Sequence, residues 1–307
     1  MKHVLVLHYS QSGQLTEILN NVVSDMVNHT ELTIDYHKIE METPFPFPWS
    51  KEEFYGVFPD TYKQNARPVK AVPKHILEKK YDLIIFGYQV WYLTPSLPTT
   101  SFLNTDDAKK LFNNTNVVTV IGCRNLWMMA QEKMKHKLKA LQANLVGNIA
   151  LVDNHINHIS VITIAQWMFS GKKERFLGIF PKPGVAQKDI DNASRFSPTI
   201  VKHILKNDFS TLQNSLLEKK AVTVKPFLVT MDTRGNAIFS KWAQIITSKS
   251  EKNTPKRAFW VKIFNYYLLF AIWIISPIVF ILFLFTYLPL YGKIKKDKKY
   301  YSSVVLK

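Results

Sequence analysis

The residues best placed to do chemistry come directly after the first apolar run of the chain. Val4 to Leu7 lead into Ser10-Gln11-Ser12-Gly13-Gln14, and a segment with helical spacing follows. Two serine hydroxyls and the unpaired N–H groups of that helix's first turn would converge on one anion, and Gly13 would let the backbone approach it closely. Such neutral donors suit a single phosphate monoester. The simpler alternative is a strand-to-helix turn in which a serine caps the helix.

The composition of this loop argues against two other kinds of phosphate site. It contains no lysine, so it lacks the Gly-Lys-Ser/Thr ending of a nucleoside triphosphate site. It contains one glycine, whereas a dinucleotide site has three spaced glycines. We therefore expect the loop to hold one terminal phosphate.

Two further loops follow apolar runs in the same way. The stretch from Gly87 to Leu103 reads GYQVWYLTPSLPTTSFL, and either Trp91 or Tyr92 offers a flat apolar wall on which a conjugated ring can stack. The stretch Ile121-Gly122-Cys123-Arg124-Asn125 ends the next apolar run. All three loops follow the carboxyl ends of predicted strands, which is where ligands bind in doubly wound sheets.

The elements that must position these loops are short strands alternating with helices. Five apolar runs predict strands, at 4–7, 32–36, 83–86, 117–121 and 149–152. Segments with helical spacing lie between them, including 15–27 and 126–145. Strands and helices in alternation predict a parallel sheet covered on both faces, and the continuous apolar character of the strands agrees with burial on both sides.

Two segments interrupt this alternation. Residues 43–68 are rich in proline and aromatic residues, and they predict a long ordered excursion after the second strand. Residues 155–185 form an insertion after the fifth strand, before a last helix predicted at 191–205. We expect the domain to comprise residues 1–210, followed by a basic extension at 211–258.

The C-terminal region has a different character. Ile263 to Tyr291 are 29 residues without a charge, and lysines or arginines flank them on both sides. This length suffices for a helix to cross a bilayer, and tyrosines at both ends suit its interfaces. We expect a membrane segment at 259–292 and a basic tail at 293–307. Because both flanks are basic, a single crossing helix and a helical hairpin turning at Ser276-Pro277 both remain open.

Composition supports this division. The chain of 307 residues is 47% hydrophobic and carries a formal net charge of +17. Eleven lysines or arginines against two acidic residues lie between Lys249 and Lys307, around the most apolar tract. This placement favours an anionic membrane over nucleic acid. The single cysteine, Cys123, cannot form an internal disulfide, and no signal segment precedes the first apolar run, so we expect the bulk to be cytoplasmic, on the inner membrane.

The order Val-Trp-Tyr, then Pro-Ser-Leu-Pro, then Phe-Leu after the third strand resembles the flavodoxin-like FMN reductases. The resemblance implies an α/β fold with a flavodoxin-like, doubly wound five-stranded parallel sheet, and FMN as the cofactor. It assigns cofactor contacts to Ser10, Ser12, Gly13, Gln14, Leu15, Thr16, Val90, Trp91, Tyr92, Gly122, Cys123 and Arg124. One departure is Leu15, where that family usually has a hydroxyl. The quinone-reductase branch, in which backbone amides do more of the work, is closer.

The YSQSGQL opening, the insertion after the fifth strand and the basic hydrophobic tail together resemble a narrower family, the aromatases of dialkylresorcinol and flexirubin-type pigment biosynthesis. This resemblance implies oxidation of a 2,5-dialkylcyclohexane-1,3-dione, made by a partner ketosynthase, to a dialkylresorcinol. A substrate with two alkyl chains is lipid-like, which would explain a membrane anchor on a flavoenzyme.

Other functions remain open from the residues alone. A quinone reductase that uses NAD(P)H would keep the flavin and reverse the direction of electron flow. A membrane-tethered electron carrier is a further alternative, although such carriers tend to be acidic, and a scaffold without flavin is the last. A homodimer is compatible with each of them.

Candidates for the catalytic polar roles are few. His155 and His158 begin the insertion, and a histidine there can act as a base near neutral pH. Arg124 can neutralise the oxygens of a dione or a reduced flavin. For each of these residues an ordinary structural role is the alternative. Cys123 is expected to be a small buried residue, since no second thiol is present to resolve an oxidised form.

Overall fold

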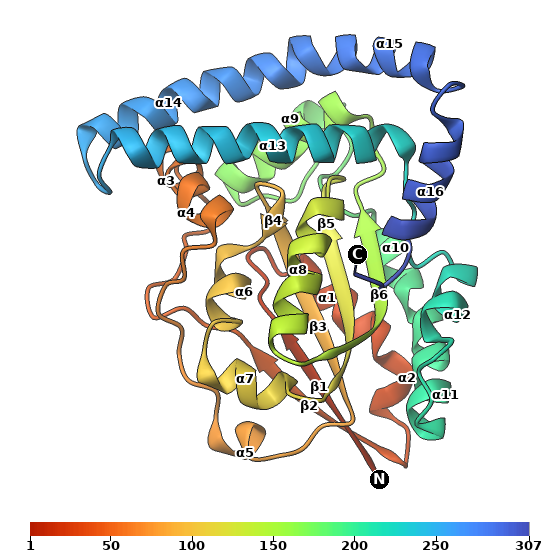
Figure 1. The fold of residues 1–307 in the computed structure, drawn as a ribbon. Coiled ribbons are helices and arrows are strands. Elements are labelled where there is room, and N and C mark those ends of the chain that lie inside the picture. Colours follow the sequence, from red (N-terminus) through yellow and green to blue (C-terminus); the bar gives the residue numbers. More distant parts are fainter. Residues whose placement is uncertain (307) are drawn as a thin grey trace.

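The computed structural model describes residues 1–306. Its core is a sheet of five parallel strands in the order β2-β1-β3-β5-β6, and a two-residue strand, β4 (Thr94–Pro95), pairs antiparallel with the end of β3 (Figure 1). The order reverses between β1 and β3, which is the flavodoxin-like switch point. The fold class expected from the sequence is confirmed. The five strands are β1 (Lys2–His8), β2 (Leu32–Lys38), β3 (Leu83–Trp91), β5 (Asn116–Cys123) and β6 (Asn144–Val152).

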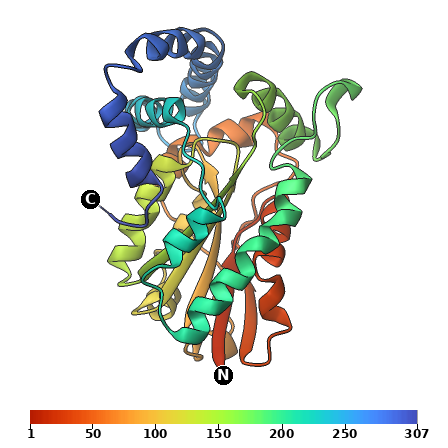
Figure 2. The same ribbon diagram turned by 90° about the vertical axis from the view of Figure 1, so that its right-hand side faces the viewer.

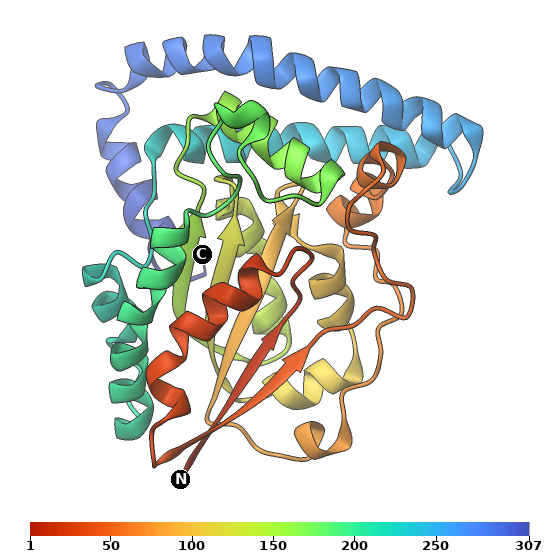
Figure 3. The ribbon, with the colours of Figure 1, turned by 180° about the vertical axis from the view of Figure 1, so that it is seen from behind.

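Helices cover both faces of this sheet, so the strands are buried as their apolar runs predicted. The two layers lie on opposite sides of the strands in Figures 1, 2 and 3. One layer contains α1 (Gln14–Val22), α2 (Ser24–Val27), α10 (Gln187–Asp191), η2 (Asn192–Phe196), α11 (Ser197–Lys206) and α12 (Leu212–Glu218). The other contains α6 (Leu97–Phe102), α7 (Asp106–Phe112) and α8 (Met128–Ala140), while α5 (Lys74–Leu77) lies near the amino ends of the strands.

Two boundaries differ from the predictions. The helix expected at 126–145 ends at Ala140, because β6 already begins at Asn144. The helix expected at 15–27 is divided, since Val23 interrupts it between α1 and α2. Runs of apolar residues at such junctions fit both the 3.6-residue period of a helix and the two-residue period of a strand, so the sequence pattern alone places the ends of these elements poorly.

Two glycines allow α1 to lie close to the sheet. A Cβ at Gly87 would come within 2.6 Å of a Leu19 methyl carbon, and one at Gly122 within 3.1 Å of an Ile18 methyl carbon. These glycines lie near the carboxyl ends of β3 and β5. The start of α1 is thereby held beside the two loops that follow those strands.

The excursion after β2 is ordered, as expected. It contains α3 (Lys51–Gly56), which begins with a capping box between Ser50 and Glu53, and α4 (Phe58–Lys63). Asp60 of α4 forms ion pairs with Arg67 (3.1 Å) and with Lys252 (3.1 Å), from the connection between two C-terminal helices. This carboxylate therefore ties the excursion to the C-terminal part of the chain.

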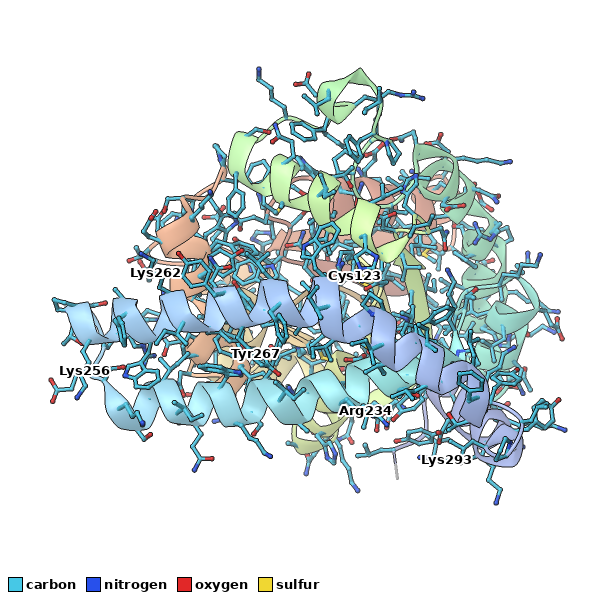
Figure 4. The ribbon with its side chains drawn as sticks, turned by 90° about the horizontal axis from the view of Figure 1, so that it is seen from above. Cys123, Arg234, Lys256, Lys262, Tyr267 and Lys293 are labelled. Atoms are coloured by element: carbon cyan, nitrogen blue, oxygen red, sulfur yellow. The ribbon has the colours of Figure 1, made fainter. Side chains whose placement is uncertain are left out.

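Three long helical elements lie across the carboxyl ends of the strands, and we call them the roof helices. They are α9 (Asn157–Ser170) of the insertion, α13 (Pro226–Lys249), and the continuous run of α14 (Pro255–Phe270), η3 (Ala271–Ile275) and α15 (Ser276–Thr286). Viewed from above, α13 and the α14–α15 run lie side by side, with α9 beyond them (Figure 4). The insertion also contains a short helix, η1 (Phe176–Gly178).

The apolar tract forms one helix, so the helical hairpin considered for residues 263–291 is wrong. A proline lacks an N–H and leaves the carbonyl group four residues earlier without a helical partner. Here the helix passes Pro277 without reversing, because the π-helical turn at 271–275 precedes it and absorbs the extra residue.

The chain then returns to the sheet domain. After α16 (Tyr291–Tyr301), the Ser302 carbonyl accepts a hydrogen bond from Gln213 (2.8 Å) and the Val305 carbonyl accepts one from Lys135 (2.9 Å). The segment 211–258, expected as a basic extension, is helical for much of its length. Its helix α12 packs on β6, and the Ala150 N–H donates to the Ala221 carbonyl (2.8 Å).

Candidate functional site

The loop after β1 meets two other loops at the carboxyl edge of the sheet. The Gln11 N–H donates to the side-chain oxygen of Gln89 (3.1 Å), beside Val90 at the end of β3. The Gln11 amide nitrogen donates to the carbonyls of Phe45 (3.3 Å) and Pro46 (2.5 Å) in the excursion. Gln11, which sequence reasoning did not select, therefore fastens the three loops to one another.

The loop itself has the features of an anion site. Gly13 precedes α1 in a left-handed conformation (φ 83°), which glycine adopts without strain, and no side chain caps this helix. The alternative of a serine cap is therefore wrong. The Ser10 hydroxyl is buried and has no hydrogen-bond partner within residues 1–306, and the N–H groups of the first turn of a helix lack intrahelical partners. Together with the partly exposed Ser12, these donors fit a phosphate group.

The side chains at the start of α1 point to other partners. Gln14 exchanges two hydrogen bonds with the backbone of Val185 at the end of the insertion (3.1 and 3.2 Å). Leu15 is buried, and its side chain lies beneath Gly122. The Thr16 hydroxyl lies 2.8 Å from Nε2 of His8, whose pKa burial lowers to about 4. The side chains of these three residues are thus engaged elsewhere, so what they can offer to an anion is their backbone N–H groups.

The loop after β3 is lined with aromatic rings. Trp91 lies edge-on to Tyr9, Phe45 and Trp49, with ring centroids 5.3–6.1 Å apart. The Tyr92 hydroxyl donates to the Phe54 carbonyl (2.5 Å). Aromatic side chains of the excursion thus pack against this loop.

The turn of this loop is strained. Tyr92 and Leu93 connect β3 to β4, and both have positive φ, at 50° and 60°. Two consecutive positive φ values define a type I′ hairpin turn, which normally contains Asn-Gly. Each such non-glycine residue costs on the order of 1–3 kcal/mol. Conformations of this kind persist where the surroundings over-determine them, as at ligand sites.

The loop after β5 is held from the insertion. The Arg124 guanidinium donates to the side-chain oxygen of Asn157 on α9 (3.1 Å), and the Asn125 amide donates to the same oxygen (3.0 Å). Burial lowers the pKa of Arg124 to about 10, so it remains a cation near pH 7. Desolvation also raises the pKa of the Cys123 thiol, but the residue is half-buried rather than buried as expected.

The two histidines of the insertion serve different partners. His155 Nδ1 lies 2.6 Å from Asp153, whose other oxygen accepts from the Ser160 hydroxyl (2.6 Å). His158 Nε2 donates to the Ile272 carbonyl (3.1 Å) in the π-helical turn, and its ring lies 4.9 Å from that of Trp273. His155 is thus oriented by a carboxylate at the end of β6, whereas His158 joins α9 to the α14–α15 run.

Asp232 of α13 is a buried carboxyl that sequence reasoning missed. One of its oxygens accepts from the Met129 N–H at the start of α8 (3.1 Å), and the other has no partner within residues 1–306. Burial raises its pKa to about 7. Lys133 lies nearby, with its pKa lowered to about 8 by burial, and donates to the Leu93 carbonyl (3.3 Å). An isolated aspartate in a basic segment carries no motif that would have revealed it.

Two further observations concern a cavity and metal binding. A cavity of about 430 Å³ lies elsewhere, beside the edge strand β6, and includes Asn154, Asp189 and Arg195 in its lining. Within residues 1–306, no group of three or more histidine, cysteine or acidic side chains could hold a metal ion.

The strand order, with its reversal between β1 and β3, places this chain in the flavodoxin-like fold class. No protein-family model matches it, and no curated protein sequence matches it significantly. Among solved structures, it is similar to a flavoprotein in complex with FMN from Lactobacillus acidophilus NCFM, with 16% identity, TM-score 0.40, 49% of this chain and 93% of that chain covered. It is similar to a putative flavoprotein from Bacteroides eggerthii DSM 20697, with 16% identity, TM-score 0.39 and coverages of 49% and 89%.

A longer likeness is to RosB with the bound intermediate 8-demethyl-8-formylriboflavin-5'-phosphate. It has 11% identity and TM-score 0.38, and it covers 83% of this chain and 93% of that chain. At these identities and scores, the fold class rests on the strand order of the chain itself.

Proposed function

We propose that this chain is an FMN-dependent oxidoreductase that aromatises a lipid-like cyclic dione at a membrane. The assignment of FMN rests on the Ser10 hydroxyl, which is buried, has no hydrogen-bond partner within residues 1–306 and lies beside the uncapped start of α1. This position is next to the aromatic loop of Trp91, at the topological switch point of the sheet. Ser10, Ser12 and the amides of residues 13–16 would hold the phosphate. Residues 90–92 and 122–124 would flank the ring.

The substrate class follows from the roof helices and from the family resemblance. Apolar side chains dominate the surface of the α14–α15 run above the carboxyl edge, and the insertion contributes an apolar helix, α9. A dione with two alkyl chains would find apolar surface for both chains there. Aromatisation of a 2,5-dialkylcyclohexane-1,3-dione to a dialkylresorcinol removes a hydride from one ring carbon and a proton from its neighbour. Bound FMN supplies the hydride acceptor and is reduced by two electrons.

The residues of the chain would handle the proton and the developing negative charge. Because Asp153 engages Nδ1 of His155, the other ring nitrogen, Nε2, is available to accept the substrate proton. The half-buried Arg124 guanidinium would stabilise the enolate oxygens. His158 is committed to the Ile272 carbonyl, so we assign it a positioning role.

The visible spectrum of the detergent-purified protein tests this proposal. A yellow flavin chromophore that bleaches anaerobically on adding a dialkylcyclohexanedione, without NADPH, would support the aromatase. Bleaching by NADPH and not by the dione would instead indicate the quinone reductase, and a stable semiquinone without turnover would indicate an electron carrier. A folded protein that cannot take up FMN would refute the flavin assignment.

A further inference from the structure

The long helix of the roof exposes an apolar surface far larger than a soluble domain normally leaves uncovered. The continuous run Pro255–Thr286 has a mean hydropathy of 2.9 over its most apolar 18 residues, and most of these residues are exposed. Exposed side chains that recur every three or four residues mark its outer face, namely Tyr266, Phe270, Ile274, Ile278, Ile281 and Phe285. A surface of this kind requires an apolar partner.

Both ends of this helix are fastened to the same domain. Near its start, the Phe264 ring stacks on Phe58 of α4, and Lys252 pairs with Asp60. Beyond its end, Ser302 and Val305 are hydrogen-bonded to the sheet domain. A helix of 32 residues is about 48 Å long, well beyond the ~30 Å of a bilayer core. Crossing the bilayer would place its two ends on opposite sides and break one of these sets of contacts.

We propose that the α14–α15 run lies in the plane of one membrane leaflet and binds anionic lipid with its outer face. The charge distribution identifies the lipid. Exposed lysines flank the apolar face at both ends, with Lys256 and Lys262 before it and Lys293, Lys295, Lys296, Lys298 and Lys299 after it. Each lysine near an anionic surface contributes about 1 kcal/mol to binding. An in-plane helix also keeps both basic flanks on one side, which a single crossing cannot do.

Exposed apolar side chains at the tip of the insertion support this orientation. Leu177 and Ile179, at the tip of the insertion, are 70% and 78% exposed and lie close to Lys173 and Arg175 in sequence. In Figure 2 this tip and the α14–α15 run both lie at the upper end of the molecule, and the tip points to the side. Seen from above, Cys123 of the predicted flavin loop lies between α9 and the α14–α15 run (Figure 4). The leaflet would therefore lie on the same side of the molecule as the predicted flavin loop.

Labelling of the full-length chain tests the topology. On a Cys123→Ser background, single cysteines at Asn253 and Ser303 are probed with a membrane-impermeant maleimide in sealed vesicles of both orientations. Both cysteines should react from the same side of the membrane. Reaction from opposite sides would show a crossing helix and overturn the proposal.

The depth of the helix gives an independent readout. Spin labels at Tyr266, Ile274 and Phe285, all on the outer face, should report similar shallow depths in vesicles that contain phosphatidylglycerol. A crossing helix would place Ile274, near its middle, deepest.

Binding to vesicles tests the lipid itself. Phe285→Ser with Leu288→Ser should weaken binding to phosphatidylglycerol vesicles at least ~10-fold, whereas Val27→Ser with Tyr36→Ser, exposed apolar residues far from the roof, should not. Lys295→Glu with Lys296→Glu should weaken binding more than Lys74→Glu with Lys80→Glu. Equal binding to neutral phosphatidylcholine vesicles would overturn the anionic-lipid assignment. The inference deepens the membrane association proposed above, but none of its outcomes depends on the flavin spectrum, so the two proposals can fail separately.

Discussion

The rings of Phe58 and Phe264 stack face to face, with centroids 3.8 Å apart and planes 8° from parallel. Phe58 belongs to α4 of the excursion and Phe264 to α14 of the roof, and both are fully buried. The Phe58 ring also contacts Tyr92, which lies in a turn of the predicted flavin loop (centroids 5.1 Å apart). One small aromatic core thus joins the excursion, the roof helices and the site.

Loss of this stack should loosen the roof. Phe264→Ala should lower the free energy of unfolding by about 3–5 kcal/mol, because removal of a buried phenylalanine ring leaves a cavity. Phe259→Ala, on the same helix but 58% exposed, should change it by less than about 0.5 kcal/mol. Urea unfolding in detergent, followed by tryptophan fluorescence, measures both variants. Equal effects at the two positions would contradict the packing described here.

A negative charge in the loop after β1 should abolish phosphate binding without unfolding the chain. Ser12→Asp places a carboxylate where the phosphate would lie, so the purified protein should keep its circular dichroism and lose its yellow colour. Ser248→Asp, an exposed serine of α13, is the matched control and should remain yellow. A Ser12→Asp protein that retains stoichiometric FMN would refute the phosphate assignment.

Asp232 should make stability depend on pH. Its pKa is raised from 3.8 to about 7 in the folded chain, so the folded state binds more protons than the unfolded state between these values. Stability due to this group is therefore present at low pH and is lost as the pH rises through about 7.

The variant Asp232→Asn tests this dependence by removing the titration. Relative to the variant, the wild-type chain should lose roughly 1–3 kcal/mol of unfolding free energy between about pH 5 and about pH 8. Asp25→Asn, at an exposed position, should leave the wild-type dependence unchanged. Parallel pH profiles for wild type and Asp232→Asn would show that the carboxyl is ionised throughout.

Substitutions of the two histidines of the insertion should have different effects on the kinetics. His155→Ala should keep the flavin and slow its bleaching by the dione about 10²–10⁴-fold, because the group proposed to accept the substrate proton is lost. His158→Ala removes a contact between α9 and the α14–α15 run, so it should raise KM for long-chain diones and leave kcat nearly unchanged. Stopped-flow absorbance with short and long alkyl chains distinguishes these outcomes, and a large fall in kcat for His158→Ala would reverse the two roles.

Two glycines of the insertion test how it is coupled to the phosphate loop. Gly184 and Gly178 both have positive φ, at 82° and 70°, so alanine strains the backbone similarly at either position. Only at Gly184 would the new Cβ come within 2.7 Å of the Gln14 side-chain oxygen. Gly184→Ala should therefore weaken FMN binding in a titration of the apoprotein, and Gly178→Ala should not. Equal FMN affinities in the two variants would contradict this coupling.

Much of the fold was predictable because it is encoded by local periodicity. Each of the five strands and the ordered excursion left a pattern within a few neighbouring residues. Side-chain partners distant in sequence left none: Asp232 accepts a hydrogen bond from the Met129 N–H of α8, 103 residues away. The path of the apolar tract also depended on distant contacts, because Ser302 and Val305 hold its far end to the domain.

Gln14 and Val185 are 171 residues apart, yet two hydrogen bonds join the first residue of α1 to the end of the insertion. A ligand that orders the start of α1 therefore also restrains the segment that returns from the insertion tip, which we propose faces the lipid. Thermodynamic reciprocity requires that whatever restrains this segment from the membrane side alters the affinity of the loop for its ligand by the same factor. Under the two proposals above, retention of the cofactor and attachment to the membrane are two equilibria that share one coupling free energy.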